Sequence, residues 1–299
     1  MYTSGGTRYR QFCDRADLIP YPTSEETLLL FVGYLHQEKL SHGTMKSYLA
    51  AVRFEQISRG MGNPNTASMP KLEYVLRGAK KKTPVSTRQR LPITPQILLR
   101  LKQVWKKDPA KRDAQMLWAA ACLCFFGFLR SGEVVTSKEM DYDIHSHLCF
   151  GDIKVDSRTS PSFLQVRIKA SKTDPFRQGV SLYIGAADGP LCPVSAVLSY
   201  MVVRGDAPGP LFIWANGRYL TREKFVTGVR RALELAGLDS KRYAGHSFRV
   251  GAATIAARCG IQDALIKTLG RWESSAYTRY IRTAPDVLCG VSRTLAASS

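Results

Sequence analysis

His246 and Arg249 lie three residues apart in a stretch that otherwise has the pattern of tight, apolar helices. On a helix this spacing places both side chains on one face. Tyr280 follows downstream and offers a phenol as a nucleophile. A histidine and an arginine held on a rigid element beside such a tyrosine can carry out phosphoryl chemistry without a metal. The stretch therefore indicates phosphoryl transfer, although an isolated His-x-x-Arg is more often a core or capping histidine.

The segment 245–282 resembles the tyrosine recombinase, or phage integrase, family. Two motifs carry the resemblance: Gly245-His246-Ser247-x-Arg249-Val250-Gly251-Ala252-Ala253 and Tyr280-Ile281-Arg282. Both are most similar to the Cre branch and to the recombinases of eukaryotic Crypton and DIRS mobile elements. The resemblance implies a site-specific DNA recombinase or integrase that cleaves and rejoins DNA through a 3′-phosphotyrosyl intermediate. It also implies that neither a metal, a cofactor nor ATP is needed.

An arginine directly after an apolar helix supplies the next part of the predicted site. Residues 116–129 are nearly all apolar, Arg130 follows them, and Glu133 comes three residues later. A surface pair of these two residues would contribute roughly 0.2–0.5 kcal/mol. The resemblance instead makes Arg130 the first arginine of the family, so that Arg130 and Arg249 clamp the phosphate with planar forks of donors. Glu133 is then expected to orient its neighbours, and His246 either donates to the phosphate or accepts the proton of the nucleophile.

A predicted β-hairpin is expected to contribute a lysine to the site. Three short strands are predicted at 148–155, 163–169 and 180–184, because apolar and polar residues alternate there. The family carries a mobile lysine between its second and third strands. Lys172 fits this place best, as the general acid for the leaving 5′ oxygen, and Lys169 is the alternative.

Two positions near the carboxyl end stay open. In the family, a His or Trp directly follows the glycine that corresponds to Gly270. By position, the residue here is Arg271. Trp272 has the expected residue type but lies one position later. Tyr277 competes with Tyr280 as the nucleophile. We favour Tyr280, because its distance from Gly270 matches the family. A free phenol has a pKa of roughly 10, so it must lose its proton as it attacks.

The elements that position these residues favour a mainly α protein of two domains. An N-terminal helical bundle precedes a larger α+β domain with a small antiparallel sheet. Residues 1–22 are polar and predict an irregular arm ahead of the bundle. By the resemblance, residues 1–83 form a helical core-binding (SAM-like) domain, 84–92 a basic linker, and 93–299 the catalytic domain. The two domains would close on DNA as a clamp.

The charge balance favours a polyanionic partner. Lys and Arg number 43 against 24 acidic residues, which gives a net charge of +19. Such an excess also occurs in RNA-binding and membrane-surface proteins. The basic residues expected to contact DNA are Lys46, Arg53, Lys80, Lys81, Lys82, Arg88, Arg90, Lys241 and Arg242.

The remaining sequence features exclude several classes of protein. The seven cysteines form no Cys-x-x-Cys pair and predict reduced thiols of an intracellular protein. No Cys or carboxylate spacing completes a metal site around His145 and His147, and no apolar run is long enough to span a membrane. The resemblance implies double-stranded DNA as the partner, a homo-oligomer (a tetramer on paired sites) and, in a eukaryote, the nucleus.

Two other functions fit the same residues. A type IB topoisomerase uses a closely similar set of Arg, Lys, His and Tyr. A non-catalytic DNA-binding protein derived from a mobile-element recombinase is the third possibility, although every charged catalytic position is filled here.

Overall fold

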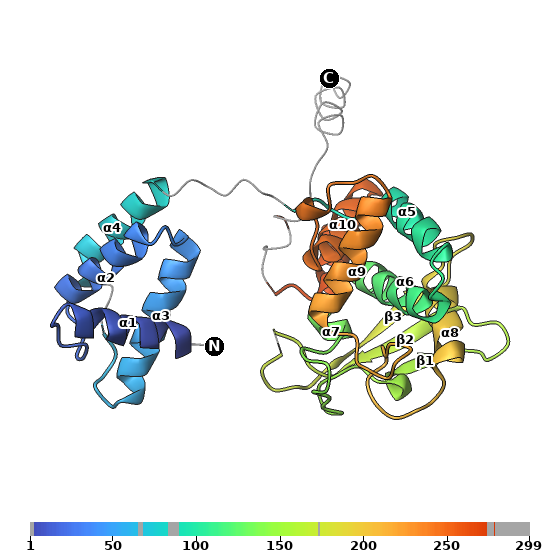
Figure 1. Cartoon of the computed structure of the whole chain (residues 1–299), viewed down its shortest axis with the longest axis horizontal. Helices are drawn as coiled ribbons and strands as arrows, with labels where there is room; N and C mark the ends of the chain where they lie inside the picture. Colours follow the sequence, from blue (N-terminus) through green and yellow to red (C-terminus); the bar gives the residue numbers. More distant parts are fainter. Residues whose placement is uncertain (1–2, 65–67, 83–89, 173, 274–277, 279–299) are drawn as a thin grey trace, which may run out of the picture. The chain divides into compact units, whose positions relative to one another are not determined.

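The computed structural model describes residues 3–64, 68–82, 90–172, 174–273 and 278. The chain divides into two compact units between Thr87 and Arg88 (Figure 1), a boundary within the segment predicted as the linker. Each unit has a hydrophobic core of its own.

The smaller unit is a helical bundle. Its helices are α1 (Thr3–Arg15), α2 (Glu25–Gln37), α3 (His42–Ser58) and α4 (Pro70–Lys82). The α2 and α3 helices begin after serine caps, since Ser24 Oγ accepts from Thr27 N and Ser41 Oγ accepts from Thr44 N. Thr23, just before the α2 cap, donates its backbone N–H and hydroxyl to Gln56 Oε1.

The prediction of an irregular arm over residues 1–22 was wrong, because most of this segment is α1. Tyr9 and Cys13 lie one helical turn apart and are fully buried. The Tyr9 ring packs edge-on against Phe31, with centroids 5.0 Å apart. The polar composition of this segment obscures the apolar face, which is stabilised by packing against α2 and α3.

The larger unit contains the rest of the described elements. Its helices are α5 (Pro95–Lys106), α6 (Lys111–Phe126), α7 (Ser131–Val134), α8 (Pro193–Arg204), α9 (Arg222–Leu235), α10 (His246–Arg258) and α11 (Asp263–Gly270). Its strands are β1 (Ile153–Val155), β2 (Phe163–Ile168) and β3 (Val180–Gly185). Helix α6 is buried along most of its length and contacts α5, α8, α9 and α10, so it forms the centre of the unit.

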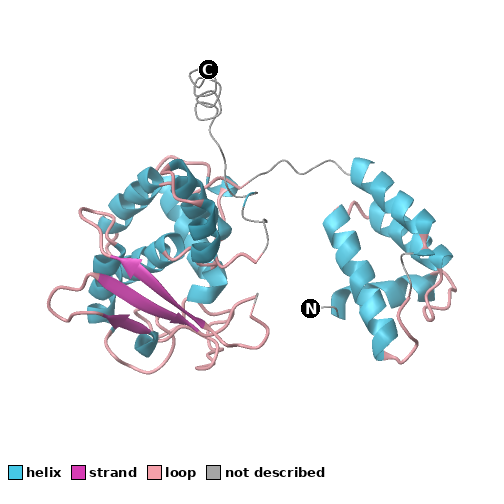
Figure 2. Ribbon diagram, turned by 180° about the vertical axis from the view of Figure 1, so that it is seen from behind, coloured by secondary structure: helices cyan, strands magenta, loops and turns pink. Residues whose placement is uncertain are grey.

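The three strands form one antiparallel sheet in the order β1-β2-β3, at one side of the helices (Figure 2). This confirms the expected small sheet in a mainly helical protein. The first strand begins at Ile153, five residues later than predicted. The reason is a 3₁₀ turn at Phe150–Asp152, in which the Asp152 carboxylate accepts from Cys149 N.

A glycine allows α10 to approach the segment before α5. Ile93 N donates to Ser247 O at 2.9 Å, and a Cβ added to Gly251 would lie 1.8 Å from Ile93 O. We expect Gly251→Ala to lower the free energy of unfolding by about 1–3 kcal/mol, because backbone atoms must move apart. Denaturant unfolding of the full chain measures the change. Gly33→Ala is the control: its Cβ meets nothing within 4 Å, so this variant should be neutral or more stable.

Candidate active site

The site begins where the core helix α6 ends. Phe128 has a positive φ of 49°, which turns the chain out of the helix and brings Arg130 to the start of α7. Glu133 accepts from Arg130 twice: Oε2 from the backbone N–H at 2.8 Å and Oε1 from Nη1 at 2.8 Å. The Glu133 side chain is only 4% exposed, whereas that of Arg130 is 25% exposed. The pair is therefore not a surface ion pair.

The start of α10 lies against the start of α7. A Cβ added to Gly245 would come within 2.4 Å of Ser131 Oγ, so a larger residue here would force the Ser131 side chain to move. Helix α10 begins at His246, and Ser247 Oγ accepts from Ala244 N. Half-buried His246 thus lies at the helix end that faces Arg130.

Burial lowers the pKa of His246 below its ordinary value, and the positive charges of Arg249, Arg130 and Arg222 lower it further. Each of these causes disfavours the imidazolium form. The charges also show that Arg130, His246 and Arg249, which are far apart in the sequence, lie near one another. They are three of the five residues that the sequence predicted to converge; the others are Lys172 and Tyr280.

Arg249 is completely buried. Its Nη1 donates to Phe128 O at 2.7 Å and its Nη2 donates to Gly270 O. The Trp272 ring covers the guanidinium, with its centroid 4.3 Å from Arg249 Cζ. The Arg249 guanidinium is therefore not exposed to solvent, and it can influence the site only through its electric field.

Arg271 approaches the same carboxylate from the end of α11. It has left-handed backbone torsions (φ 52°), which end the helix and turn its side chain back toward α7. Its Nη2 donates to Glu133 Oε2 at 2.7 Å, so Glu133 joins Arg130 and Arg271. Burial lowers the pKa of Arg271, with the Arg130 charge acting in the same direction and Glu133 opposing it.

Trp272 folds back over the helix end. A Cβ added to Gly270 would lie 1.8 Å from the Trp272 ring, and the ring packs edge-on against Phe128 at 6.4 Å. Both residues considered for the open position, Arg271 and Trp272, thus lie in the cluster. They differ in what they touch, because Arg271 pairs with a carboxylate and Trp272 packs on an arginine and a phenylalanine.

The two candidate lysines have different surroundings. Lys169 Nζ lies 2.6 Å from Asp152 Oδ2 and 3.2 Å from Cys149 Sγ. Although burial lowers the pKa of Lys169, the hydrogen bonds from the lysine to Asp152 and Cys149 raise it overall. Lys172 is exposed at the turn between β2 and β3. The Asp152 partner was not foreseen, because only the 3₁₀ turn before β1 brings it to the end of β2.

The hairpin that carries Lys172 lies beside α11. A cavity of about 640 Å³ separates them, lined by Ser171 and Gly179 on the hairpin and by Lys267, Arg271 and Trp272 on the other side. The cavity therefore connects the hairpin turn with the arginine cluster.

Several predicted residues lie elsewhere. Tyr280, Tyr277 and Arg88 are outside the described residues. The predicted DNA-binding residues that are described are all exposed: Lys46, Arg53, Lys80, Lys81 and Lys82 in the smaller unit, and Arg90, Lys241 and Arg242 in the larger. Arg90 donates to Lys241 O, which ties two of these positions together.

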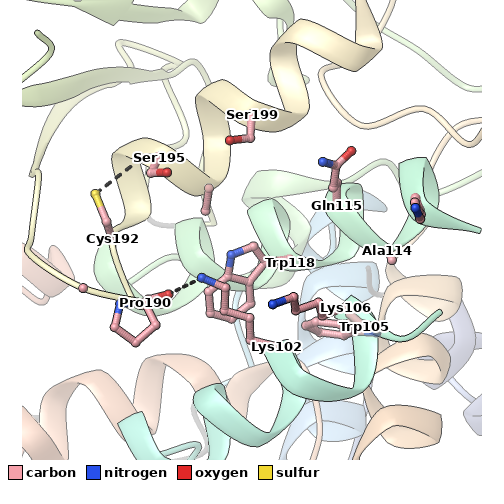
Figure 3. Close-up of a pocket in the computed structure, with 13 residues that line it drawn as sticks. Lys102, Trp105, Lys106, Ala114, Gln115, Trp118, Pro190, Cys192, Ser195 and Ser199 are labelled. Atoms are coloured by element: carbon pink, nitrogen blue, oxygen red, sulfur yellow. Dashed lines mark hydrogen bonds between the residues drawn. The ribbon is translucent and has the colours of Figure 1, made fainter.

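A separate hollow lies between α5, α6 and α8 (Figure 3). Trp105 and Trp118 lie at its base, and Lys102 reaches across to donate to Pro190 O at 2.6 Å. It contains none of the predicted site residues. In the described part of the chain, no group of His, Cys, Asp or Glu side chains is arranged to hold a metal ion. None of the described helices has the length and apolarity to cross a membrane.

The lowered pKa of His246 predicts a pH dependence of stability. The unfolded chain, with a histidine pKa near 6.5, binds the proton before the folded chain does as pH falls. Stability should therefore decrease as pH drops below about 6.5, and His246→Gln should reduce this decrease. Melting temperatures of both proteins between about pH 5 and 7 test this. Parallel curves would show that His246 does not contribute.

Comparison with known proteins agrees with this geometry. No family model matches the chain. It is 23% identical to an integrase/recombinase xerD homolog of Selenomonas ruminantium over 296 residues, which cover 94% of this chain and 80% of that protein.

Solved structures show the same fold. The XerH site-specific recombinase, in a post-cleavage complex with its difH substrate, gives a TM-score of 0.63 at 16% identity over 90% of this chain and 69% of that chain. The Tn1549 transposon integrase with transposon right end DNA gives 0.61 at 15% identity over 98% and 93%. A lambda integrase dimer on a core site gives 0.58 at 18% identity over 94% and 87%. The chain is thus similar in sequence to an integrase/recombinase and shares the fold of the XerH site-specific recombinase and the lambda integrase.

Proposed function

We propose that the chain is a site-specific recombinase or integrase that breaks and rejoins double-stranded DNA through a 3′-phosphotyrosyl link to Tyr280. One observation carries the proposal: Arg130 and Arg271 are held by the two oxygens of buried Glu133, beside His246 and Arg249. These residues come from three separate segments of the chain. A cluster with this excess of positive charge is suited to an anionic phosphodiester.

The positive charge of the cluster can stabilise the negative charge that develops in the transition state. Negative charge grows on the non-bridging oxygens of the phosphate as the nucleophile attacks, and fixed guanidiniums stabilise that charge. Arg130, with a quarter of its side chain exposed, is accessible to the phosphate. Arg249 lies behind it and acts through its field, which is strong because the surroundings are dry.

Two side chains carry out the proton transfers of the reaction. The lowered pKa of His246 keeps the imidazole neutral near neutral pH, so it can accept the phenol proton of Tyr280. Lys172, on the exposed hairpin turn, donates a proton to the leaving 5′ oxygen. The bond between phosphorus and the 5′ oxygen breaks as a bond forms between phosphorus and the phenol oxygen of Tyr280. A 5′ hydroxyl can reverse this exchange, so rejoining needs neither a metal nor ATP.

The remaining features concern the partners. The excess of basic residues supports binding to DNA, with the two units closing on the duplex as a clamp. We further propose that several copies act together, as a tetramer on paired sites, and that in a eukaryote the protein works in the nucleus.

A selection for covalent adducts tests this function. The full chain is incubated with a pool of nicked duplexes of random sequence, and DNA that stays bound after denaturation is recovered and sequenced. We expect a tyrosine-linked adduct on a defined target, followed by strand exchange between two copies of it. Relaxation of supercoils by a monomer without strand exchange would indicate a topoisomerase. DNA binding without any adduct would indicate a non-catalytic protein.

A further inference from the structure

Arg271 has hydrogen-bond donors that the protein leaves unused. Its Nη2 pairs with Glu133, but its Nε and Nη1 are buried and have no hydrogen-bond partner within the described part of the chain. Buried unpaired donors cost free energy, so they are rarely left in this state without a purpose.

A second buried arginine shows how this fold satisfies a structural guanidinium. Arg204, at the end of α8, donates from Nε to Leu211 O, from Nη1 to Gly205 O and Ala207 O, and from Nη2 to Pro210 O. All three of its nitrogens are used. Arg271 is also held in place, but two of its nitrogens make no hydrogen bond among the described residues. This pattern is expected of a guanidinium that binds an acceptor from outside the chain.

The charges around Arg271 point to an anion as that acceptor. Arg130, Arg249 and Arg271 together carry three positive charges, and Glu133 is the carboxylate to which Arg130 and Arg271 are paired. Arg130 and Arg271 thus share one carboxylate, so the charge of Glu133 balances only one of these two guanidiniums. A phosphate supplies both negative charge and pairs of oxygens that the planar fork of a guanidinium can bind.

Trp272 has a different position from Arg271. Its ring is 9% exposed, covers the Arg249 guanidinium and packs against Phe128. These contacts use the face and the edge of the ring. The side chain therefore holds Arg249 in place from one side, while carbonyl oxygens of Phe128 and Gly270 hold it from the other.

We propose that Arg271, paired with Arg130 through Glu133, donates to a non-bridging oxygen of the scissile phosphate, and that Trp272 is a positioning residue that keeps Arg249 behind them. The inference deepens the proposed function and rests on it. The cavity of about 640 Å³ between α11 and the hairpin, which Arg271 lines, is the path by which the phosphate reaches this guanidinium.

Oxyanion binding by the free protein tests the role of Arg271 without any DNA reaction. The melting temperature is measured in inorganic phosphate and in chloride at equal ionic strength. We expect phosphate to raise it in the unmodified chain and Arg271→Gln to lose most of this rise. Arg258→Gln, an exposed arginine at the other end of α10, should keep the rise. An equal rise in all three proteins would overturn the proposal. Arg271→Lys, which keeps the charge, provides a second variant if the glutamine variant does not fold.

Covalent adduct formation on the selected duplex then tests the contact with DNA. We expect Arg271→Gln to reduce the rate on the order of 10²–10³-fold, as for loss of one preorganised donor. A methylphosphonate at the scissile position replaces one non-bridging oxygen with a methyl group and is uncharged, so it should restore much of the rate of this variant. Trp272→Phe keeps a ring without an N–H and should stay within about tenfold of the unmodified chain.

The opposite pattern would assign the contact to Trp272: a large loss in Trp272→Phe with little loss in Arg271→Gln. Failure of the proposed function is distinguishable from either result, because the unmodified chain would then form no adduct although its response to inorganic phosphate remains.

Discussion

Glu133→Gln should lower the free energy of unfolding by about 3–5 kcal/mol, because it removes the charge that two partly or fully buried guanidiniums share. A neutral amide still fits the space, but it cannot compensate Arg130 and Arg271. Covalent adduct formation should fall as well, by at least about 10²-fold, because neither guanidinium stays aligned. Denaturant unfolding and the rate of adduct formation on the selected duplex measure the two effects.

Glu139→Gln is the matched control for this experiment. Glu139 also contacts two cations, Arg218 and Lys224, but its side chain is 33% exposed. Water can solvate the charges of Arg218 and Lys224 when the carboxylate is lost. The free energy of unfolding of this variant should therefore be close to that of the unmodified chain. If both glutamate variants were equally stable and active, the Glu133 carboxylate would not be the group that organises the site.

Tyr280→Phe should abolish the covalent adduct, with a loss of at least about 10³-fold, because removing the nucleophilic oxygen leaves no atom to form the bond. Tyr277→Phe should keep most of the activity. Mass spectrometry of the peptide attached to the trapped nucleotide identifies the modified tyrosine directly.

The binding of DNA provides the control for the tyrosine variants. Both should bind the selected duplex as tightly as the unmodified chain, since a phenol hydroxyl contributes little to the largely electrostatic affinity. An adduct on Tyr277, or an adduct that survives in Tyr280→Phe, would contradict our choice of nucleophile.

The sequence was sufficient for the residues whose relationship is local. Helical spacing placed His246 and Arg249 together, and the position of Arg130 directly after a buried helix showed where it leaves the core. Helix caps such as Thr94 and Thr221 are also local, because each hydroxyl accepts from a backbone N–H three residues further on. Local patterns also gave the antiparallel sheet and the mainly helical class.

The sequence was insufficient where a residue depends on a distant partner. Helix α1 was missed, because it is stabilised by packing against α2 and α3, which the local pattern does not reveal. The choice between Lys169 and Lys172 could not be argued further until Asp152 was seen beside Lys169.

For this protein, the sequence by itself determined which side chains carry the charges and which helix faces they share. Only the tertiary structure decided that Glu133 lies between Arg130 and Arg271, that Trp272 covers Arg249, and that His246 is desolvated. The reason is physical: hydrogen bonds within a helix follow from neighbouring residues, whereas burial and the pairing of charges depend on segments that the chain brings together from more than a hundred residues apart.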